Sequence, residues 1–367
     1  MNSFTTTDEE RAQEFVVQAK AYMNAARWDE LRLAAAEDIR SYLTAGLKTE
    51  VRLADLVQFL AIGVALRVFV KDHTAPREFP QELLGTISEL INKIWIDSKQ
   101  PGFRPSDKER HELHAALGAL CPDLDPKYLL EWLLPSFETS WRIGLRLCIE
   151  LKFSTGRFHP EWSRAFIEFF HDPTKKQLEG LFKSHLLHCT ESKVSVKNII
   201  NEALRLYPPT RHIYRQFQYD GAEENGSRIK AAGIAVSWLE AILKRAGLME
   251  LAVSRLEIAD IESLHIAKDI WGADALKFDP ERWNHISDLQ KKAFMPFGNK
   301  PFLCPAKPVF APMAVGLIVG ALLAALERDN WDIQCHDSHV LEGFNRCDRL
   351  SLRRDSYTDI LLRWHSD

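Results

Sequence analysis

Cys304 lies in a short segment, residues 294–306, whose residue types suit a loop that presents sulfur to a metal ion. A cysteine thiolate is a soft anionic ligand, and the Phe297-Gly298 pair allows a tight turn beside it. Residues 308–326 carry no charged side chain, and we expect a long apolar helix to begin directly after the loop. The start of a helix favours negative charge on the sulfur. The alternative is that this cysteine only fills the core.

Glu202 and Arg205 are three residues apart, so they share one face of the helix expected at residues 196–206. Arg282 follows in a Pro-Glu-Arg-Trp motif at residues 280–283. A carboxylate can accept the planar fork of an arginine through two hydrogen bonds, so Glu202 can bind Arg205 in this way. As exposed ion pairs they would contribute almost nothing to stability.

Glu138 and Thr139 are adjacent in a long helix expected at residues 126–151. A hydroxyl can donate a proton that a carboxylate connected to water then replaces, which is general acid chemistry. Pro135 removes a backbone hydrogen bond inside this helix and is expected to open it where the two side chains lie. An ordinary kink that relieves packing is the alternative.

In this order and at this spacing, the motifs resemble the cytochrome P-450 family, particularly its fungal members. The run from Leu206 to Pro209 and the segment from Trp271 to Trp283 belong to the resemblance, which covers roughly the last two thirds of the chain. It implies a mainly α fold with small β-sheets, the haem-thiolate fold of that family. The chain is expected to be shortened, without the family's amino-terminal region.

The resemblance also implies a cofactor and a site. Cys304 matches the axial ligand of the iron in haem b, and Phe297 and Gly298 lie beside it in the motif. Glu138 and Thr139 match the acid and alcohol of the family's oxygen-binding helix. Glu202, Arg205 and Arg282 match the family's buried ion network, whose role is structural. The resemblance further implies a hydrophobic small-molecule substrate, with NADPH as reductant through a separate electron donor of the cytochrome P-450 reductase type.

Cationic partners for the haem propionates are expected just after the two prolines, at Arg211 or Arg215, with Arg215 favoured. The sequence departs from the family pattern near the ligand. Lys300 and Ala306 stand where the family usually has glycine. Phe302 stands where it usually has an arginine or histidine that pairs with a propionate, which weakens the expected anchoring.

The chain has 367 residues and a formal net charge of -4, with both signs mixed along it, which excludes the basic face of a nucleic-acid binder. Six cysteines without close pairs are typical of a reducing compartment. The polar, acidic first ten residues indicate no signal peptide and no transmembrane anchor. Residues 308–326 are interpreted as a buried core helix rather than a membrane span. We expect an intracellular protein, cytoplasmic or peripheral to the endoplasmic reticulum.

No linker or repeat marks a boundary, so one domain is expected over residues 1–367. Residues 1–260 form its mainly helical part, with the oxygen-binding helix near 126–151, and residues 261–367 hold the haem-ligand loop with the following helix and strands. Capping boxes are expected at Thr7 with Glu10 and at Ser106 with Glu109. Apolar periodicity predicts helices at 12–24, 28–45, 53–70, 81–96, 113–120, 163–171, 175–190 and 196–206, and strands near 213–219, 331–335 and 358–364.

Two functions remain open at this point. The first is a haem-thiolate monooxygenase that oxidises a hydrophobic small molecule, in fungal secondary metabolism. The second is a shortened non-oxidative or haem-free descendant that acts as an isomerase, a cyclase, or a binding or scaffold protein. Four lysines near Cys304 either steer an acidic reductase or form an ordinary solvated face: Lys291, Lys292, Lys300 and Lys307.

Overall fold

A computed structural model describes residues 9–44, 50–70, 79–97, 106–154, 159–181, 194–219, 230–232, 253–299, 303–327 and 331–364. Only the backbone is described for residues 9–12, 214–219, 230–232 and 253–257. These parts of the chain are mainly helical with two small sheets, which confirms the fold class predicted from the sequence.

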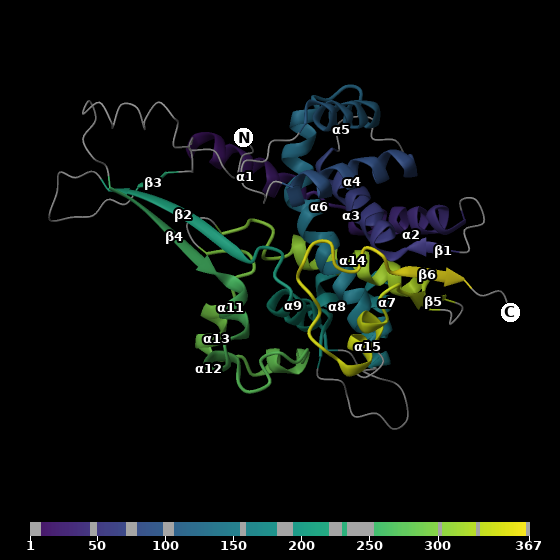
Figure 1. Cartoon of the computed structure of the whole chain (residues 1–367), viewed down its shortest axis with the longest axis vertical. Coiled ribbons are helices and arrows are strands. Elements are labelled where there is room, and N and C mark those ends of the chain that lie inside the picture. Colours follow the sequence, from purple (N-terminus) through teal and green to yellow (C-terminus); the bar gives the residue numbers. More distant parts are fainter. Residues whose placement is uncertain are drawn as a thin grey trace.

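The core is built around two helices that are apolar on nearly every face, α3 (Leu53–Phe69) and α14 (Phe310–Ala325). The long helix α6 (Pro126–Cys148) packs against both, near the centre of the molecule in Figure 1, and continues into the π-helical turn η1 (Ile149–Phe153). The other helices of this body are α1 (Glu9–Asn24), α2 (Trp28–Thr44), α4 (Gln81–Asp97), α5 (Asp107–Leu120), α7 (Pro160–His171), α8 (Lys175–Glu179) and α9 (Val196–Leu206).

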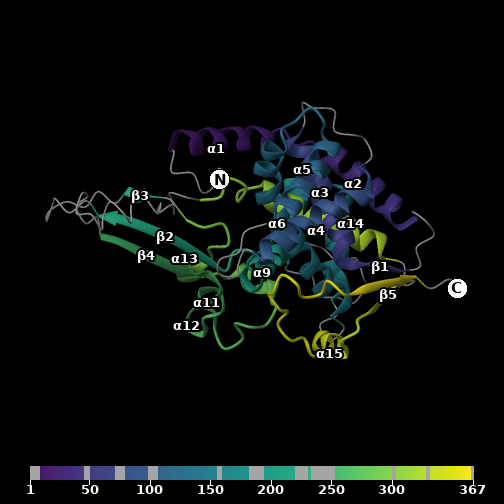
Figure 2. The same cartoon turned by 45° about the horizontal axis from the view of Figure 1, so that its top comes forward.

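The two sheets lie on opposite sides of the helical body in both views (Figure 1, Figure 2). One has the antiparallel order β1-β6-β5, with β1 (Glu50–Arg52), β6 (Leu361–Trp364) and β5 (Trp331–Gln334). The other has the order β3-β2-β4 and extends away from the helices, with β3 (Lys230–Ala232), β2 (His212–Tyr219) and β4 (Val253–Asp260). Because β2 follows α9 directly, the second sheet is tied to the helix that carries the predicted ion network.

Short helices connect β4 to the loop of Cys304. They are α11 (Ile261–Ile266), α12 (Lys268–Trp271), the 3-10 helix η3 (Pro280–Asn284) and α13 (Asp288–Ala293). After α14 and β5, helix α15 (Ser338–Arg346) leads into residues 347–360, which we call the C-terminal segment. This segment lies against α6 and makes the main polar contacts of that helix.

Two arginines of α6 are buried against the C-terminal segment. Arg142 donates to the carbonyl oxygens of Pro209 at 2.7 Å and Leu352 at 3.1 Å. Arg146, of which 1% is exposed, donates to the carbonyl oxygens of Ser351 at 2.7 Å and Arg353 at 3.0 Å. Burial lowers the pKa of each guanidinium to about 10, so both stay charged at neutral pH, with backbone carbonyls as their hydrogen-bond partners.

Helices α7 and α14 approach closely through two glycines of α14. A Cβ atom added to Gly320 would lie 2.6 Å from the carbonyl oxygen of Phe166, and one added to Gly316 would lie 2.7 Å from Cε1 of Phe169. Both distances are shorter than carbon contacts in proteins allow. The missing side chains therefore let aromatic residues of α7 pack directly on the backbone of α14.

Most of the expected helices are confirmed within a few residues, and so is the capping box of Ser106 with Glu109 at the start of α5. The box of Thr7 with Glu10 lies outside the described side chains. The helix expected at 175–190 is α8, which ends at Glu179, and residues 182–193 lie outside the described ranges. Among the described residues, none of the helices combines the length and apolarity that crossing a membrane requires.

Candidate functional site

The loop of Cys304 is closed by backbone hydrogen bonds at both ends of a tight turn. The N–H of Cys304 donates to the carbonyl oxygen of Phe297 at 2.9 Å, and the N–H of Gly298 donates to that of Met295 at 3.1 Å. Gly298 has a φ of 71°, a conformation that side chains disfavour, so glycine suits this turn. The structure thus brings together the three predicted ligand-loop residues Phe297, Gly298 and Cys304.

The environment of the Cys304 sulfur combines burial with two backbone donors. Burial raises the pKa of the thiol, while hydrogen bonds from the backbone of Ala306 and Lys307 act in the opposite direction. The long apolar helix expected after the loop is confirmed as α14, but it begins at Phe310, six residues after Cys304 rather than directly after it. Residues 305–309 form turns instead, and their N–H groups take the place that a helix start would have had.

Glu202 is the centre of a buried network that joins α9 to residues 279–283. Arg205 donates to both of its oxygens, at 2.8 and 2.9 Å, and neither side chain is exposed. Arg282 donates to Glu202 Oε1 at 2.9 Å, and Trp283 Nε1 donates to Oε2 at 3.0 Å. The backbone N–H of Asp279 adds a further bond to Oε1 at 2.9 Å. A fully satisfied carboxylate of this kind holds α9 and η3 in one arrangement.

The remaining donors of Arg205 reach into the segment between α11 and η3. They bind the carbonyl oxygens of His265 at 2.8 Å, Ala275 at 2.7 Å and Lys277 at 3.2 Å. The guanidinium also lies over the ring of Trp271, 5.0 Å from its centroid. One side chain of α9 therefore organises the segment that precedes the Cys304 loop.

Glu138 and Thr139 point to different environments on α6. Glu138 is buried and pairs with Arg354 of the C-terminal segment, whereas Thr139 is exposed and donates from Oγ1 to the carbonyl oxygen of Pro135 at 3.0 Å. The helix assignment continues through Pro135, and the departure from α-helical bonding lies at η1 instead. Among the described residues, no hydrogen bond or ion pair joins Glu138 or Thr139 to the loop of Cys304.

The two candidate propionate partners lie near the start of β2. Arg211 pairs with Glu262 and keeps 43% of its side chain exposed. Glu262 also accepts from Arg349 at 3.1 Å. The backbone of Arg215 lies in β2 opposite Glu257, and its side chain is outside the described residues, as are Lys300 and Phe302.

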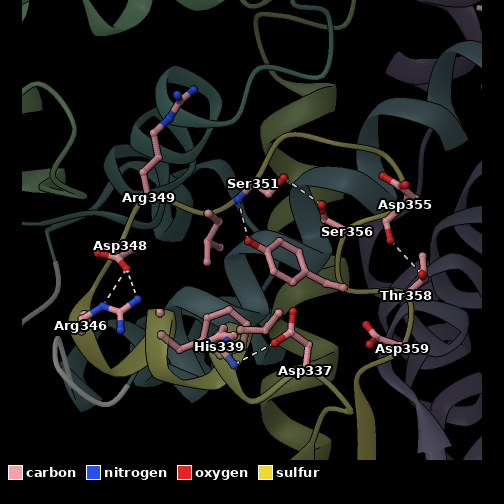
Figure 3. A pocket seen from close by; sticks show the side chains of 15 residues that line it. Asp337, His339, Arg346, Asp348, Arg349, Ser351, Asp355, Ser356, Thr358 and Asp359 are labelled. Carbon is pink, nitrogen blue, oxygen red and sulfur yellow. Dashed lines mark hydrogen bonds and ion pairs between the residues drawn. The ribbon is translucent and has the colours of Figure 1, made fainter.

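A cavity of about 480 Å³ lies elsewhere, between α15 and the C-terminal segment (Figure 3). None of the predicted site residues lines it. Its polar side chains bind one another: Arg346 pairs with Asp348 at 2.9 Å, and Ser356 Oγ donates to Ser351 Oγ at 2.8 Å. These four side chains therefore already have partners within the cavity wall.

Two residues that the motifs did not indicate contact the predicted site. His265 touches the network of Arg205, and Arg354 pairs with Glu138. His265 is 60 residues from its partner and Arg354 is 216 residues from its own. No local sequence pattern predicts contacts between residues so far apart in the chain, so these two residues could not be predicted from the sequence.

Comparison with known proteins gives partial matches, and no family model matches the chain. A cytokinin hydroxylase of Arabidopsis thaliana is 29% identical over 133 residues, which are 36% of this chain and 21% of that protein. Benzoate 4-monooxygenase bphA of Aspergillus niger is 39% identical over 67 residues, 18% of this chain and 13% of the relative. Cytochrome P450 52A1 of Candida tropicalis is 30% identical over 112 residues, which are 30% of this chain and 18% of that protein. The matches therefore span only 13% to 21% of these relatives.

Proposed function

We propose that this chain, which is similar to cytochromes P450 over part of its length, is a haem-thiolate monooxygenase that oxidises a hydrophobic small molecule. The observation that supports this most is the loop of Cys304. Its sulfur receives two backbone N–H donors, and its backbone closes on Phe297 beside the turn at Gly298. When bound, haem would supply the oxidising chemistry at its iron.

The residues present fit a haem ligand of this type. A thiol is the soft donor that iron in this class takes, and N–H groups directed at sulfur moderate its negative charge. Burial keeps the free thiol protonated, so metal binding would have to release a proton from Cys304. Arg211 offers an exposed cation after α9 for a carboxylate, although it must share its charge with Glu262.

Proton delivery is assigned to Thr139 and Glu138. The exposed hydroxyl of Thr139 can turn from the Pro135 carbonyl oxygen towards a bound molecule, because a hydroxyl rotates freely. Glu138 can exchange protons with water only after its pairing with Arg354 loosens. In this proposal Thr139 donates and Glu138 replaces the proton.

We also infer the partners. An NADPH-dependent reductase would supply electrons, and Lys291 and Lys292 at the end of α13 offer exposed positive charge for an acidic partner. In this proposal the chain acts in fungal secondary metabolism; two of the relatives are fungal. The buried ion pair of Glu138 favours one second candidate, a non-oxidative catalyst or binding protein, because it holds the acid away from water.

Haem loading tests the proposal directly. The protein is purified with and without added haem, reduced, and exposed to carbon monoxide. We expect the strongly red-shifted carbonyl band of a thiolate ligand in the wild type and in Cys335→Ser, a control at a similarly half-buried cysteine, and its loss in Cys304→Ser. A wild-type protein that takes up no haem would refute the monooxygenase and leave the second candidate.

A further inference from the structure

His265 lies in α11 between helix α9 and the loop of Cys304, and none of its side chain is exposed. Its Nδ1 atom is 3.1 Å from the carbonyl oxygen of Arg205. On the other side of the ring, the backbone N–H of Met295 donates to Nε2 at 2.9 Å. The imidazole also stacks on Phe294, with ring centroids 5.6 Å apart.

These partners fix the protonation of the ring. A backbone N–H can only donate, so Nε2 must be the acceptor, and a carbonyl oxygen can only accept, so Nδ1 must carry the hydrogen. Only the neutral ring with hydrogen on Nδ1 makes both bonds. His265 therefore acts as a one-way link from a donor in the loop to an acceptor in α9.

This link through His265 connects the buried network of Glu202 to Cys304 by three consecutive contacts. Arg205, which binds Glu202, also donates to the backbone of His265 at 2.8 Å and so holds this residue on two sides. His265 holds Met295, whose carbonyl oxygen accepts from Gly298 at 3.1 Å. The residue before Gly298, Phe297, accepts from Cys304.

We propose that His265 is a positioning residue that fixes Met295 against α9 and thereby, through Gly298 and Phe297, sets the place of Cys304. The consequence for catalysis rests on the proposed function, in which Cys304 binds haem iron. The positioning role of His265 does not rest on the proposed function, because its hydrogen bonds form within the chain and need no haem. It can therefore be tested in protein without haem.

Two near-isosteric substitutions separate the two bonds. In His265→Asn the amide nitrogen lies near the place of Nδ1, so the bond to Arg205 can form while the Met295 N–H loses its acceptor. In His265→Gln the amide oxygen lies near the place of Nε2, so the Met295 N–H keeps its acceptor. A residue that merely fills space would tolerate both changes equally.

Hydrogen exchange at the amides of Met295, Gly298 and Cys304 is the measurement, with α3 amides as reference. We expect these three amides to exchange about tenfold faster in His265→Asn and near the wild-type rate in His265→Gln, with α3 unchanged in both. A His265→Asn protein that fails to fold while His265→Gln folds with native exchange would support the same inference. Equal rates in the two variants, or failure of both to fold, would overturn it.

Haem loading of the same variants separates this inference from the proposed function. We expect His265→Asn to lose most of the thiolate-type carbonyl band that wild type and His265→Gln show. If no variant and no wild-type protein binds haem, but the exchange pattern holds, the proposed function fails while the positioning role stands. If all three bind haem alike, the link does not set the place of Cys304.

Discussion

Glu138 and Arg354 form a buried ion pair although 216 residues separate them in sequence. Arg354 also donates to Asn92 of α4 at 3.0 Å, and its guanidinium lies over the rings of Trp95 and Trp141 at 5.1 and 5.8 Å. One cation thus joins α4, α6 and the C-terminal segment, and it binds the carboxylate that the sequence indicates as a proton donor.

Arg354→Gln should destabilise the protein by about 3 to 5 kcal/mol, because it leaves the Glu138 carboxylate buried without a cation. The double variant with Glu138→Gln should recover much of this loss, since it removes the stranded charge. Arg353→Gln is the control: this neighbour is 76% exposed and pairs with the exposed Asp355, so a change within about 0.5 kcal/mol is expected. Urea unfolding measures all three, and additive effects would contradict the buried pair.

Thr139→Ala should release peroxide at the expense of product, because the exposed hydroxyl to which we assign proton donation is gone while electron supply continues. Thr139→Ser keeps the hydroxyl and should stay coupled. The measurement compares NADPH consumed, peroxide released and product formed with a competent reductase and a substrate that is turned over. Unchanged coupling in Thr139→Ala and Glu138→Gln alike would remove both residues from the proton path.

Arg205→Ala should lower the free energy of unfolding by about 3 to 5 kcal/mol, since it removes the fully buried partner of Glu202. Lys197→Ala lies on the same helix and breaks an exposed pair with Glu179, so it should change little. Melting temperature and urea midpoint are the measurements. A wild-type melting temperature in Arg205→Ala would show that the network does not support the fold.

Gly320→Ala should destabilise the protein by about 1 to 3 kcal/mol, because the new Cβ would meet the Phe166 carbonyl oxygen and the side chain of Phe170. Gly118→Ala in α5 meets nothing within 4 Å and should stabilise the helix by about 0.5 to 1 kcal/mol. Opposite signs in thermal unfolding are expected. Equal effects of the two substitutions would contradict the close packing of α7 against α14.

Acid should destabilise the protein through His265. Burial lowers the pKa of this residue to about 4, helped by the positive charges of Arg205 and Arg349 and opposed by the hydrogen bond to the Arg205 carbonyl. A free histidine titrates near about 6.5, so the unfolded chain binds more protons between these values. The contribution of His265 is therefore complete above about pH 6.5 and falls by about 3 kcal/mol towards pH 4.

The matched variants for this pH profile are His265→Gln, which cannot titrate, and His339→Gln, which removes an exposed histidine. The decline between pH 6.5 and 4 should shrink in the first and persist in the second. Urea unfolding across this range provides the comparison. A profile in His265→Gln that still follows wild type would assign the decline to other groups.

Local patterns predicted local structure well. Apolar periodicity located α2 and α9 closely, and the capping box of Ser106 with Glu109 forms because both partners lie within one turn. The start of α14 was predicted too early. Residues 305–309 form turns before the helix begins at Phe310.

The candidate site was only partly predictable. The three-residue spacing of Glu202 and Arg205 indicated their pairing, and the family resemblance indicated that Arg282 joins them, while the roles of Cys304 and Thr139 stay predictions. Arg354 could not be foreseen, since its position against α6 depends on how the C-terminal segment packs. Long-range packing of this kind has no signature in neighbouring residues.

The dependence of α6 on the C-terminal segment also governs how the chain can fold. Arg142 and Arg146 bind carbonyl oxygens 205 to 210 residues further along the chain. During synthesis we expect these two arginines to stay hydrated, because the core around α6 cannot form before residues 351–354 have been synthesised. Contacts between residues so far apart in sequence slow folding, and apolar surface stays exposed until they form. We expect native α6 packing to form only after translation of that segment, with chaperone dependence greatest for nascent chains that stop short of it.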